Sequence, residues 1–368
     1  MSGTPSMAGH VLLAIESTCD ETAAAVLTRD GQVLGDCVAT QENLHQRFGG
    51  VVPEIAARAH LERIIPVIDT ALSKANVTPH QLAAIAVADR PGLAGSLLVG
   101  VVAAKTLSIA WRKPLVPINH LHAHLYACVM PMMPESNHPD ATSNATTAPL
   151  QMANAYPAVG LIVSGGHTSL YHLRGPIDLD YLGGTIDDAA GEAFDKVGSM
   201  LGLGFPGGVQ VANLAASGDP NAFAFPRSML NQDDDNFSFS GLKTAARYAI
   251  TGPGRTDFSS LKIDDVTKAN VCASFEAAVV DVLVTKACRA IRRMRVDHLL
   301  VGGGVASNQR LRRELTKAAD RDQFSVHIAP ASLCTDNAVM GAIAWLQLEQ
   351  NQIAGPDLDI TPGLQRGY

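Results

Sequence analysis

The chain has 368 residues, of which 47% are hydrophobic and 17% charged, and its formal net charge is −7. This composition is typical of a folded globular protein and excludes a disordered chain. The acidic balance excludes a global basic field for nucleic acid, so any contact with a polynucleotide has to use local patches or a partner. The six cysteines are dispersed without a CxxC spacing, which predicts reduced thiols rather than a disulfide framework or a zinc knuckle.

The first ten residues have neither the basic region nor the apolar region of a secretion signal, and no apolar run is expected to reach membrane-spanning length. The sequence therefore predicts a soluble, cytoplasmic protein with no membrane partner.

The first half opens with a predicted hairpin over residues 11–33, whose polar tip carries two adjacent acids, Asp20 and Glu21. Near a phosphate site such acids hold a cation through water or act as a base, and a solvated turn explains them equally well. A helix interrupted by prolines is expected within residues 42–73. A strand at 82–88, a glycine-rich turn and a helix at 96–111 follow, and this arrangement suits an anion because the helix N-terminus offers unpaired N–H groups.

The second half repeats this plan. Residues 158–171, AVGLIVSGGHTSLY, predict a strand, a tight turn and a second strand. A later strand at 298–301 leads through three glycines into a helix at 307–319, which matches the strand, turn and helix of the first half. The repetition predicts a duplicated α/β architecture with a ligand between the halves. We expect lobes at residues 1–130 and 158–368, joined by a flexible Pro/Ser/Thr-rich connection at 131–157.

Residues 184–208 predict one helix with an acid-rich first turn and a Gly-Phe-Pro-Gly-Gly ending. Asp187, Asp188, Glu192 and Asp195 are all expected on that helix. Because the helix dipole favours acids in the first turn, only Asp195, deeper in the helix, is a sharp functional candidate. Lys243, in the FSFSGLK turn further on, is a weaker candidate for contact with a phosphate.

A histidine cluster follows the strand expected at 115–118. On a helix, His120 and His124 share a face and can converge on one metal ion, while His122 points elsewhere. A third ligand is needed, and Asp336 is the carboxylate we nominate, although aspartate is also an ordinary N-cap residue. Two histidines and one carboxylate suit iron(II), zinc or manganese. Leu121 follows His120, so the HExxH pattern of zinc peptidases is absent.

No G-x-x-x-x-G-K-[ST] pattern occurs, which excludes a P-loop nucleotide site. Residues 302–308 are the better phosphate candidate. There a strand precedes three glycines, a helix follows, and the Asn308 amide can reach a ribose or a base.

These phrases occur in the order and spacing of one known family. They are IESTCDETAAAV, GGVVPEIAARAH, RPGLAGSLLVG, LIVSGGHTSLY, IDDAAGEAFDKVG, GFPGG, FSFSGLKT, GGGVASNQRLR and CTDNAVMGA, and they extend from about residue 11 to residue 347. The chain resembles the bacterial members of the universal tRNA N6-adenosine threonylcarbamoyltransferase family, which was formerly described as a family of O-sialoglycoprotein endopeptidases. The resemblance implies the duplicated actin-like, sugar-kinase-like (ASKHA) fold, with two lobes and a ligand cleft between them.

The resemblance also implies the site residues. A metal ion, most often described as iron(II), with zinc as the other candidate, is held by His120, His124 and Asp336, and the acids Asp20 and Glu21 take part in catalysis. The implied substrate contacts are Ile162, Val163, Ser164, Gly165, Gly166, Asp195, Gly208 and Asn308. Two positions depart from the family pattern: His122 stands where the family commonly has glutamate, and Arg90 where it commonly has glycine.

The implied reaction moves a threonylcarbamoyl group from threonylcarbamoyl-AMP to N6 of adenosine 37 in tRNAs that read codons beginning with A, and AMP leaves. The implied partners are tRNA, an inactive fold-related paralogue that forms a heterodimer with the chain, and a small P-loop ATPase. Two alternatives remain: a metallopeptidase, which the missing base of HExxH disfavours, and a non-catalytic scaffold subunit, which has no need of a metal triad.

Overall fold

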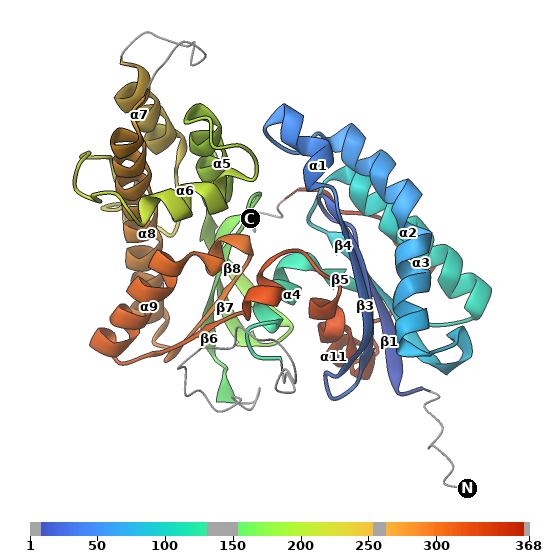
Figure 1. Ribbon diagram of the computed structural model, residues 1–368. Helices are drawn as coiled ribbons and strands as arrows, with labels where there is room; N and C mark the ends of the chain where they lie inside the picture. Colours follow the sequence, from blue (N-terminus) through green and yellow to red (C-terminus); the bar gives the residue numbers. More distant parts are fainter. Residues whose placement is uncertain (1–8, 131–153, 253–262, 364–368) are drawn as a thin grey trace, which may run out of the picture.

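The computed structural model describes residues 9–130, 154–252 and 263–363, which form two lobes (Figure 1). Each lobe is built on a five-stranded sheet, with strand order β3-β2-β1-β4-β5 in the first lobe and β8-β7-β6-β9-β10 in the second. The strands of the first sheet are β1 (Val11–Glu16), β2 (Glu21–Thr28), β3 (Val33–Thr40), β4 (Leu82–Arg90) and β5 (Leu115–Asn119). Those of the second are β6 (Ala158–Val163), β7 (Thr168–Gly175), β8 (Asp178–Gly184), β9 (His298–Gly302) and β10 (Ser325–Ile328).

The two sheets have the same topology. In each lobe the first three strands form an antiparallel meander, the first strand pairs in parallel with the fourth, and the fourth pairs in parallel with the fifth. The first strand of each lobe is buried along its whole length, as expected of an apolar run at the centre of a covered sheet. The predicted duplication is therefore confirmed, and with it the actin-like α/β fold class.

Helices cover the outer faces of both sheets (Figure 1). In the first lobe these are α2 (Pro53–Ala75) and α3 (Ala94–Trp111), preceded by the short α1 (Glu42–His45) and η1 (Gln46–Phe48). Helix α4 (His120–Tyr126) lies between the lobes. In the second lobe the helices are α5 (Ala190–Met200), α6 (Gly207–Ala215), α7 (Ser240–Thr251), α8 (Asp265–Met294) and α9 (Gln309–Asp322). The described residues also contain the short elements η2 (Pro79–Gln81), η4 (Gly304–Ser307), α10 (Ala331–Cys334), η5 (Val339–Ile343) and α11 (Ala344–Glu349).

The core crosses from one lobe to the other. One continuous cluster of buried side chains includes Ala14 of β1, Leu121 of α4 and Leu161 of β6, so the inner faces of both sheets meet around α4. A second cluster lies on the outer face of the first sheet, where Leu13 packs with Ile68 of α2 and Val101 of α3. Helix α4 is thus fixed on both sides by apolar packing.

The C-terminal segment after β10 returns to the first lobe. Gln347 of α11 donates to the carbonyl of Pro117 at 2.9 Å, and Ala354 forms a β-bridge with Leu115. A Cβ at Gly341 of η5 would lie 2.7 Å from that of Ala14, so this segment sits directly on β1. The first lobe is therefore completed by residues from the far end of the chain.

The single helix predicted for 184–208 is wrong in its bounds. Strand β8 runs to Gly184, α5 begins only at Ala190, and the glycines of the Gly-Phe-Pro-Gly-Gly turn open a further helix, α6. Asp187 and Asp188 precede the helix, because Asp187 accepts a bond from the amide of Phe239 at 2.9 Å and Asp188 pairs with two lysines. Long-range partners therefore override the local helical pattern.

Within the described ranges, one helix, α3, is long and apolar enough to cross a membrane by length and composition, so the expectation that no apolar run reaches that length is wrong. One such helix is weak evidence for a membrane span, since a core helix passes the same test. Lys105, in its middle, donates to the carbonyl of Leu358 at 2.9 Å, and Val101 and Ala104 are buried against the first sheet. The connection predicted at 131–157 lies outside the described residues up to position 153.

Candidate metal centre between the lobes

Helix α4 begins where β5 ends, and this junction places two histidines. The Asn119 side chain caps the helix, because its Oδ1 accepts bonds from the amides of Leu121 at 2.9 Å and His122 at 3.3 Å. The helix therefore starts at His120, and His124 follows one turn later on the same face. Their rings are 4% and 0% exposed and meet edge to face, with centroids 4.6 Å apart.

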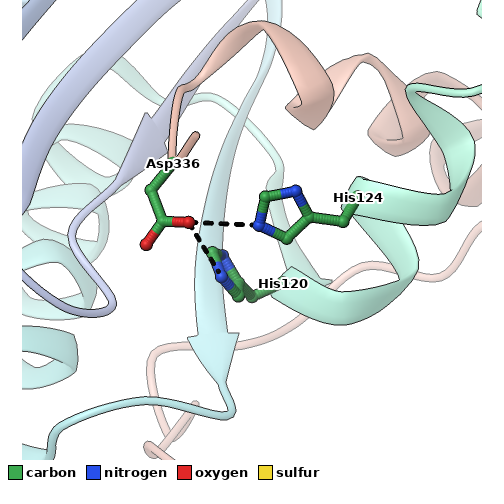
Figure 2. A group of neighbouring side chains, drawn as sticks. All are labelled: His120, His124 and Asp336. Carbon is green, nitrogen blue, oxygen red and sulfur yellow. Dashed lines mark hydrogen bonds and ion pairs between the residues drawn. The ribbon is translucent and has the colours of Figure 1, made fainter. Parts of the chain in front are cut away.

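Asp336 reaches the two histidines from the loop between α10 and η5 (Figure 2). Its Oδ1 lies 3.4 Å from Nε2 of His120 and 3.1 Å from Nε2 of His124. The neighbouring Asn337, not Asp336, caps the following turn, since its Oδ1 accepts from the amide of Met340 at 3.1 Å. One ligand atom from each of the three residues lies within 4.8 Å of the others, so this group can hold a metal ion.

The surroundings of His120 fit such an ion. Oε2 of Glu16 lies 3.0 Å from Nδ1 of His120, and this contact assigns the ring proton to Nδ1 in a neutral imidazole. In that neutral form Nε2 is free to act as a metal ligand, and in the protonated form it donates a hydrogen bond to Asp336. Burial disfavours charge on His120, but Glu16 and Asp336 outweigh it and raise its pKa well above the usual range. This position therefore attracts positive charge, as a metal site must.

The two histidines have the opposite effect on the pKa of Asp336. Burial favours its neutral form, yet His120 and His124 hold the pKa of Asp336 well below the usual range. The carboxylate is thus ionised and ready to bind a cation.

Glu16 is a candidate site residue that the sequence reasoning missed. It ends β1 and is 3% exposed, and its Oε1 accepts from the amide of Thr18 at 2.6 Å while Oε2 contacts His120. Its position could have indicated a role, since Glu16 is an acid at the end of an otherwise apolar strand. A buried carboxylate requires partners, so such an acid is expected to contact other polar groups.

We expect the substitution Glu16→Gln to weaken metal binding by about 10-fold to 100-fold, the usual effect of losing a partner that orients a metal-ligating histidine. The amide cannot accept hydrogen bonds from Thr18 and His120 at both of its terminal atoms. Metal affinity measured by competition with a chelator tests this expectation, and nitrogen NMR reports the protonation of the His120 ring with and without metal. Glu42→Gln, at an exposed position, is the control. An unchanged affinity in Glu16→Gln would contradict the positioning role.

Asp20 and Glu21 lie at the turn between β1 and β2, beside Asp336. Burial is the main reason that the pKa of Glu21 rises to about 10, and the charges of Asp336 and Asp20 and a hydrogen bond to Asp20 add to the effect. Asp20 also contributes, after burial, to the raised pKa of Asp195 in the second lobe. The charges of these acids and of Asp336 therefore affect one another's protonation.

The turn between β6 and β7 forms the opposite wall. It is closed by two bonds, from the amide of Ser164 to the carbonyl of His167 at 2.7 Å and from the amide of His167 to Oγ of Ser164 at 3.1 Å. Gly165 and Gly166 are exposed, and a Cβ at either would meet nothing within 4 Å. Ile162 and Val163 lie in β6 with fully buried side chains, so only their backbone is available to a ligand.

The remaining predicted contacts lie at or against helix N-termini. Oδ1 of Asp195 accepts from the amide of Gly208 at 3.0 Å, in the first turn of α6. Asn308 caps α9 by accepting from the amide of Leu311 at 2.9 Å, and its Nδ2 donates to Glu276 at 2.7 Å. One N–H of that amide is left for a ligand. Lys243 forms an ion pair with Asp188, which neutralises its charge.

Two further histidines border the group. Burial lowers the pKa of His167 to about 4, helped by the charge of His120, so a neutral imidazole of the second lobe faces the site. His122 is not part of the ligand group, and burial and Arg90 lower its pKa to about 4. The two positions that depart from the family pattern therefore interact with each other.

A duplicated sheet in two lobes, with a metal-type donor set at their junction, defines an actin-like α/β protein with its site between the lobes. Solved structures agree on the fold. Full-length HypF in its phosphate- and nucleotide-bound form matches 94% of this chain and 48% of its own at 13% identity, with a TM-score of 0.59. Component A of (R)-2-hydroxyglutaryl-CoA dehydratase from Acidaminococcus fermentans matches 92% of this chain and 99% of its own at 12% identity, with a TM-score of 0.50.

Sequence comparison is more specific. The family model for tRNA N6-adenosine threonylcarbamoyltransferase matches residues 32–143 and 136–343. A protein of that name from Rhodopirellula baltica is 66% identical over 99% of this chain and 100% of its own, and one from Anaeromyxobacter dehalogenans strain 2CP-C is 47% identical over 95% and 98%. The chain belongs to the tRNA N6-adenosine threonylcarbamoyltransferase family. It is a transferase that acts on tRNA and forms N6-threonylcarbamoyladenosine at position 37. The peptidase and scaffold alternatives are not favoured.

Proposed function

We propose that the chain takes the threonylcarbamoyl group from threonylcarbamoyl-AMP and transfers it to adenosine 37 of tRNAs that read codons beginning with A, releasing AMP. His120, His124 and Asp336 would hold one divalent metal ion. Iron(II) is the first candidate for this ion and zinc the second. The observation that carries this proposal is the convergence of both Nε2 atoms on one oxygen of Asp336, next to the acids of the β1–β2 turn. When bound, the metal supplies positive charge that polarises the carbonyl or phosphate oxygen of the mixed anhydride.

The second lobe supplies the proposed cradle for the adenylate. The exposed glycines of the β6–β7 turn offer amide N–H groups to developing negative charge, through close approach that a side chain would hinder. The amides at the start of α6, where Asp195 meets Gly208, and the remaining N–H of Asn308 would bind the nucleotide part. These groups come from separate elements of the second lobe.

The attacking amine is a weak nucleophile, because its lone pair is delocalised into the adenine ring. The step forms a bond from N6 to the carbamoyl carbon and breaks the bond from that carbon to the phosphate oxygen, and AMP leaves with the electron pair. One proton leaves the amine. Because burial and neighbouring carboxylates favour the protonated form of Glu21, we assign Asp20 as the acceptor of that proton and Glu21 as its hydrogen-bond partner.

We further propose that the chain works in the cytoplasm with an inactive fold-related paralogue, as a heterodimer, and with a small P-loop ATPase. Helices α2 and α3 pack together and leave large apolar side chains exposed on the outside of the first lobe. Leu61 is 67% exposed, Ile65 57%, Val102 51% and Ile109 64%. A second subunit that covers these side chains would remove an apolar surface from water, and we assign this face to the paralogue.

The test combines the full chain and its partner subunits with threonylcarbamoyl-AMP labelled in the threonine and with unmodified tRNA. We expect label at adenosine 37 and an equal amount of AMP. A tRNA that reads codons beginning with another base serves as the control and should stay unlabelled. Label in that control would contradict the substrate assignment, and absence of label from every tRNA would contradict threonylcarbamoyl-AMP as the donor.

A further inference from the structure

Three residues near the start of α2 form an exposed surface of arginine and aromatic character, which we call the Arg47 surface: Arg47, Phe48 and Arg58. The Phe48 side chain is 50% exposed, and the guanidinium of Arg47 lies over its ring at 4.7 Å from the centroid. Neither arginine has an ion pair or a hydrogen bond to another side chain within the described parts of the chain. In an acidic protein, these are cations free to bind something else.

The Arg47 surface borders an open pocket, and a buried histidine lies beneath its backbone. Arg47 and Arg58 line an open pocket of about 360 Å³ together with Glu54 and Ile55. The buried ring of His45 supports the segment from beneath, because its Nδ1 accepts from the amide of Val52 at 3.3 Å. This bond anchors the backbone that carries the Arg47 surface, whose own side chains contact one another through Arg47 and Phe48.

The same segment is connected to the proposed catalytic turn. The amide of Gln41, just before α1, donates to the carbonyl of Asp20 at 3.2 Å. Directly after Phe48, a Cβ at Gly49 would lie 3.7 Å from Oγ of Ser199 in α5, so the segment extends from the acid turn to the opposite lobe. Figure 1 shows α1 at the opening between the lobes, facing α5. A macromolecule bound at this edge would lie next to the acid turn of the first lobe and α5 of the second.

We propose that the Arg47 surface binds the anticodon loop of tRNA beside adenosine 37. The inference rests on the tRNA-modifying activity of the family. An anticodon loop offers unstacked bases, which aromatic and guanidinium planes bind by stacking, and closely spaced phosphates, which unpaired arginines bind. Glu54 repels phosphate from its side of the pocket, so the backbone would follow the two arginines. A protein partner could also use an exposed ring and arginines, so the experiment below includes subunit assembly as a separate readout.

The experiment uses the full chain with its partner subunits and an unmodified tRNA transcript. We expect Phe48→Ala to weaken tRNA binding by about 10-fold to 100-fold, the effect of losing one base–aromatic stack. Arg47→Gln and Arg58→Gln should each lower the slope of log affinity against log salt by about 0.7, the value for one phosphate of a single strand. In the transfer assay the KM for tRNA should rise while kcat at saturating tRNA stays unchanged.

Arg313→Gln is the matched control, because it removes the same charge from an exposed position of α9 in the second lobe. Equal weakening by Arg313→Gln would overturn the proposal, since the effect would then be one of net charge. Loss of subunit assembly with tRNA affinity unchanged would overturn it in favour of a protein partner. tRNA affinity is measured separately from threonylcarbamoyl transfer. A variant that leaves tRNA affinity unchanged therefore contradicts the Arg47 surface without contradicting threonylcarbamoyl-AMP as the donor.

Discussion

Replacing His124 by alanine should abolish metal binding and reduce threonylcarbamoyl transfer to the rate of the metal-free chain. The expected loss of metal affinity exceeds about 100-fold, because the change removes a ligand itself and not merely a group that orients one. His124 is fully buried, and its Nε2 is one of the two nitrogens that face Asp336. Metal content per chain and transfer of labelled threonylcarbamoyl are the two measurements.

The control is His172→Ala, a half-buried histidine on β7 outside the ligand group. It should retain both metal and transfer. Chelation of the wild-type chain followed by addition of iron(II) or zinc then identifies the ion that restores transfer. Full transfer by His124→Ala would contradict the metal assignment and leave the family's reaction intact.

The substitution Asp20→Asn should slow the single-turnover rate of transfer by about 100-fold to 10,000-fold, the range for loss of a general base. Asparagine keeps the shape of the side chain but cannot take up the amine proton. Metal content and tRNA affinity should stay close to those of the wild type, because Asp20 is not among the three ligand residues. Rapid-quench measurement with bound adenylate separates the chemical step from tRNA binding and product release.

Two further variants sharpen that test. Asp30→Asn makes the same chemical change at the exposed β2–β3 turn and should leave the rate unchanged. Glu21→Gln should have a smaller effect than Asp20→Asn, because burial and the neighbouring carboxylates raise the pKa of Glu21 and favour its protonated form. An unchanged rate in Asp20→Asn would eliminate it as the base, and a larger loss in Glu21→Gln would reverse the two roles.

The sequence predicted the duplicated sheets because each half repeats the same order of apolar strands and glycine turns, a local signal. The His120–His124 pair could be predicted for the same reason, since its spacing is set by one helical turn. Glu16 could not be assigned a role from the pattern, because its partner His120 is 104 positions away and the two meet only after β1 and α4 pack together. The start of α5 was missed for a related reason: Asp187 is held by the distant Phe239.

The return of the C-terminal segment to the first lobe has a consequence for biosynthesis. A ribosome releases the first sheet and both histidines of α4 long before it releases Asp336, Gly341 and Gln347. Until then, the part of β1 that Gly341 covers lacks this contact, and the two histidines lack the carboxylate of the candidate metal group. The inner face of the first sheet is therefore covered, and the three candidate ligands are brought together, only after nearly the whole chain has been made.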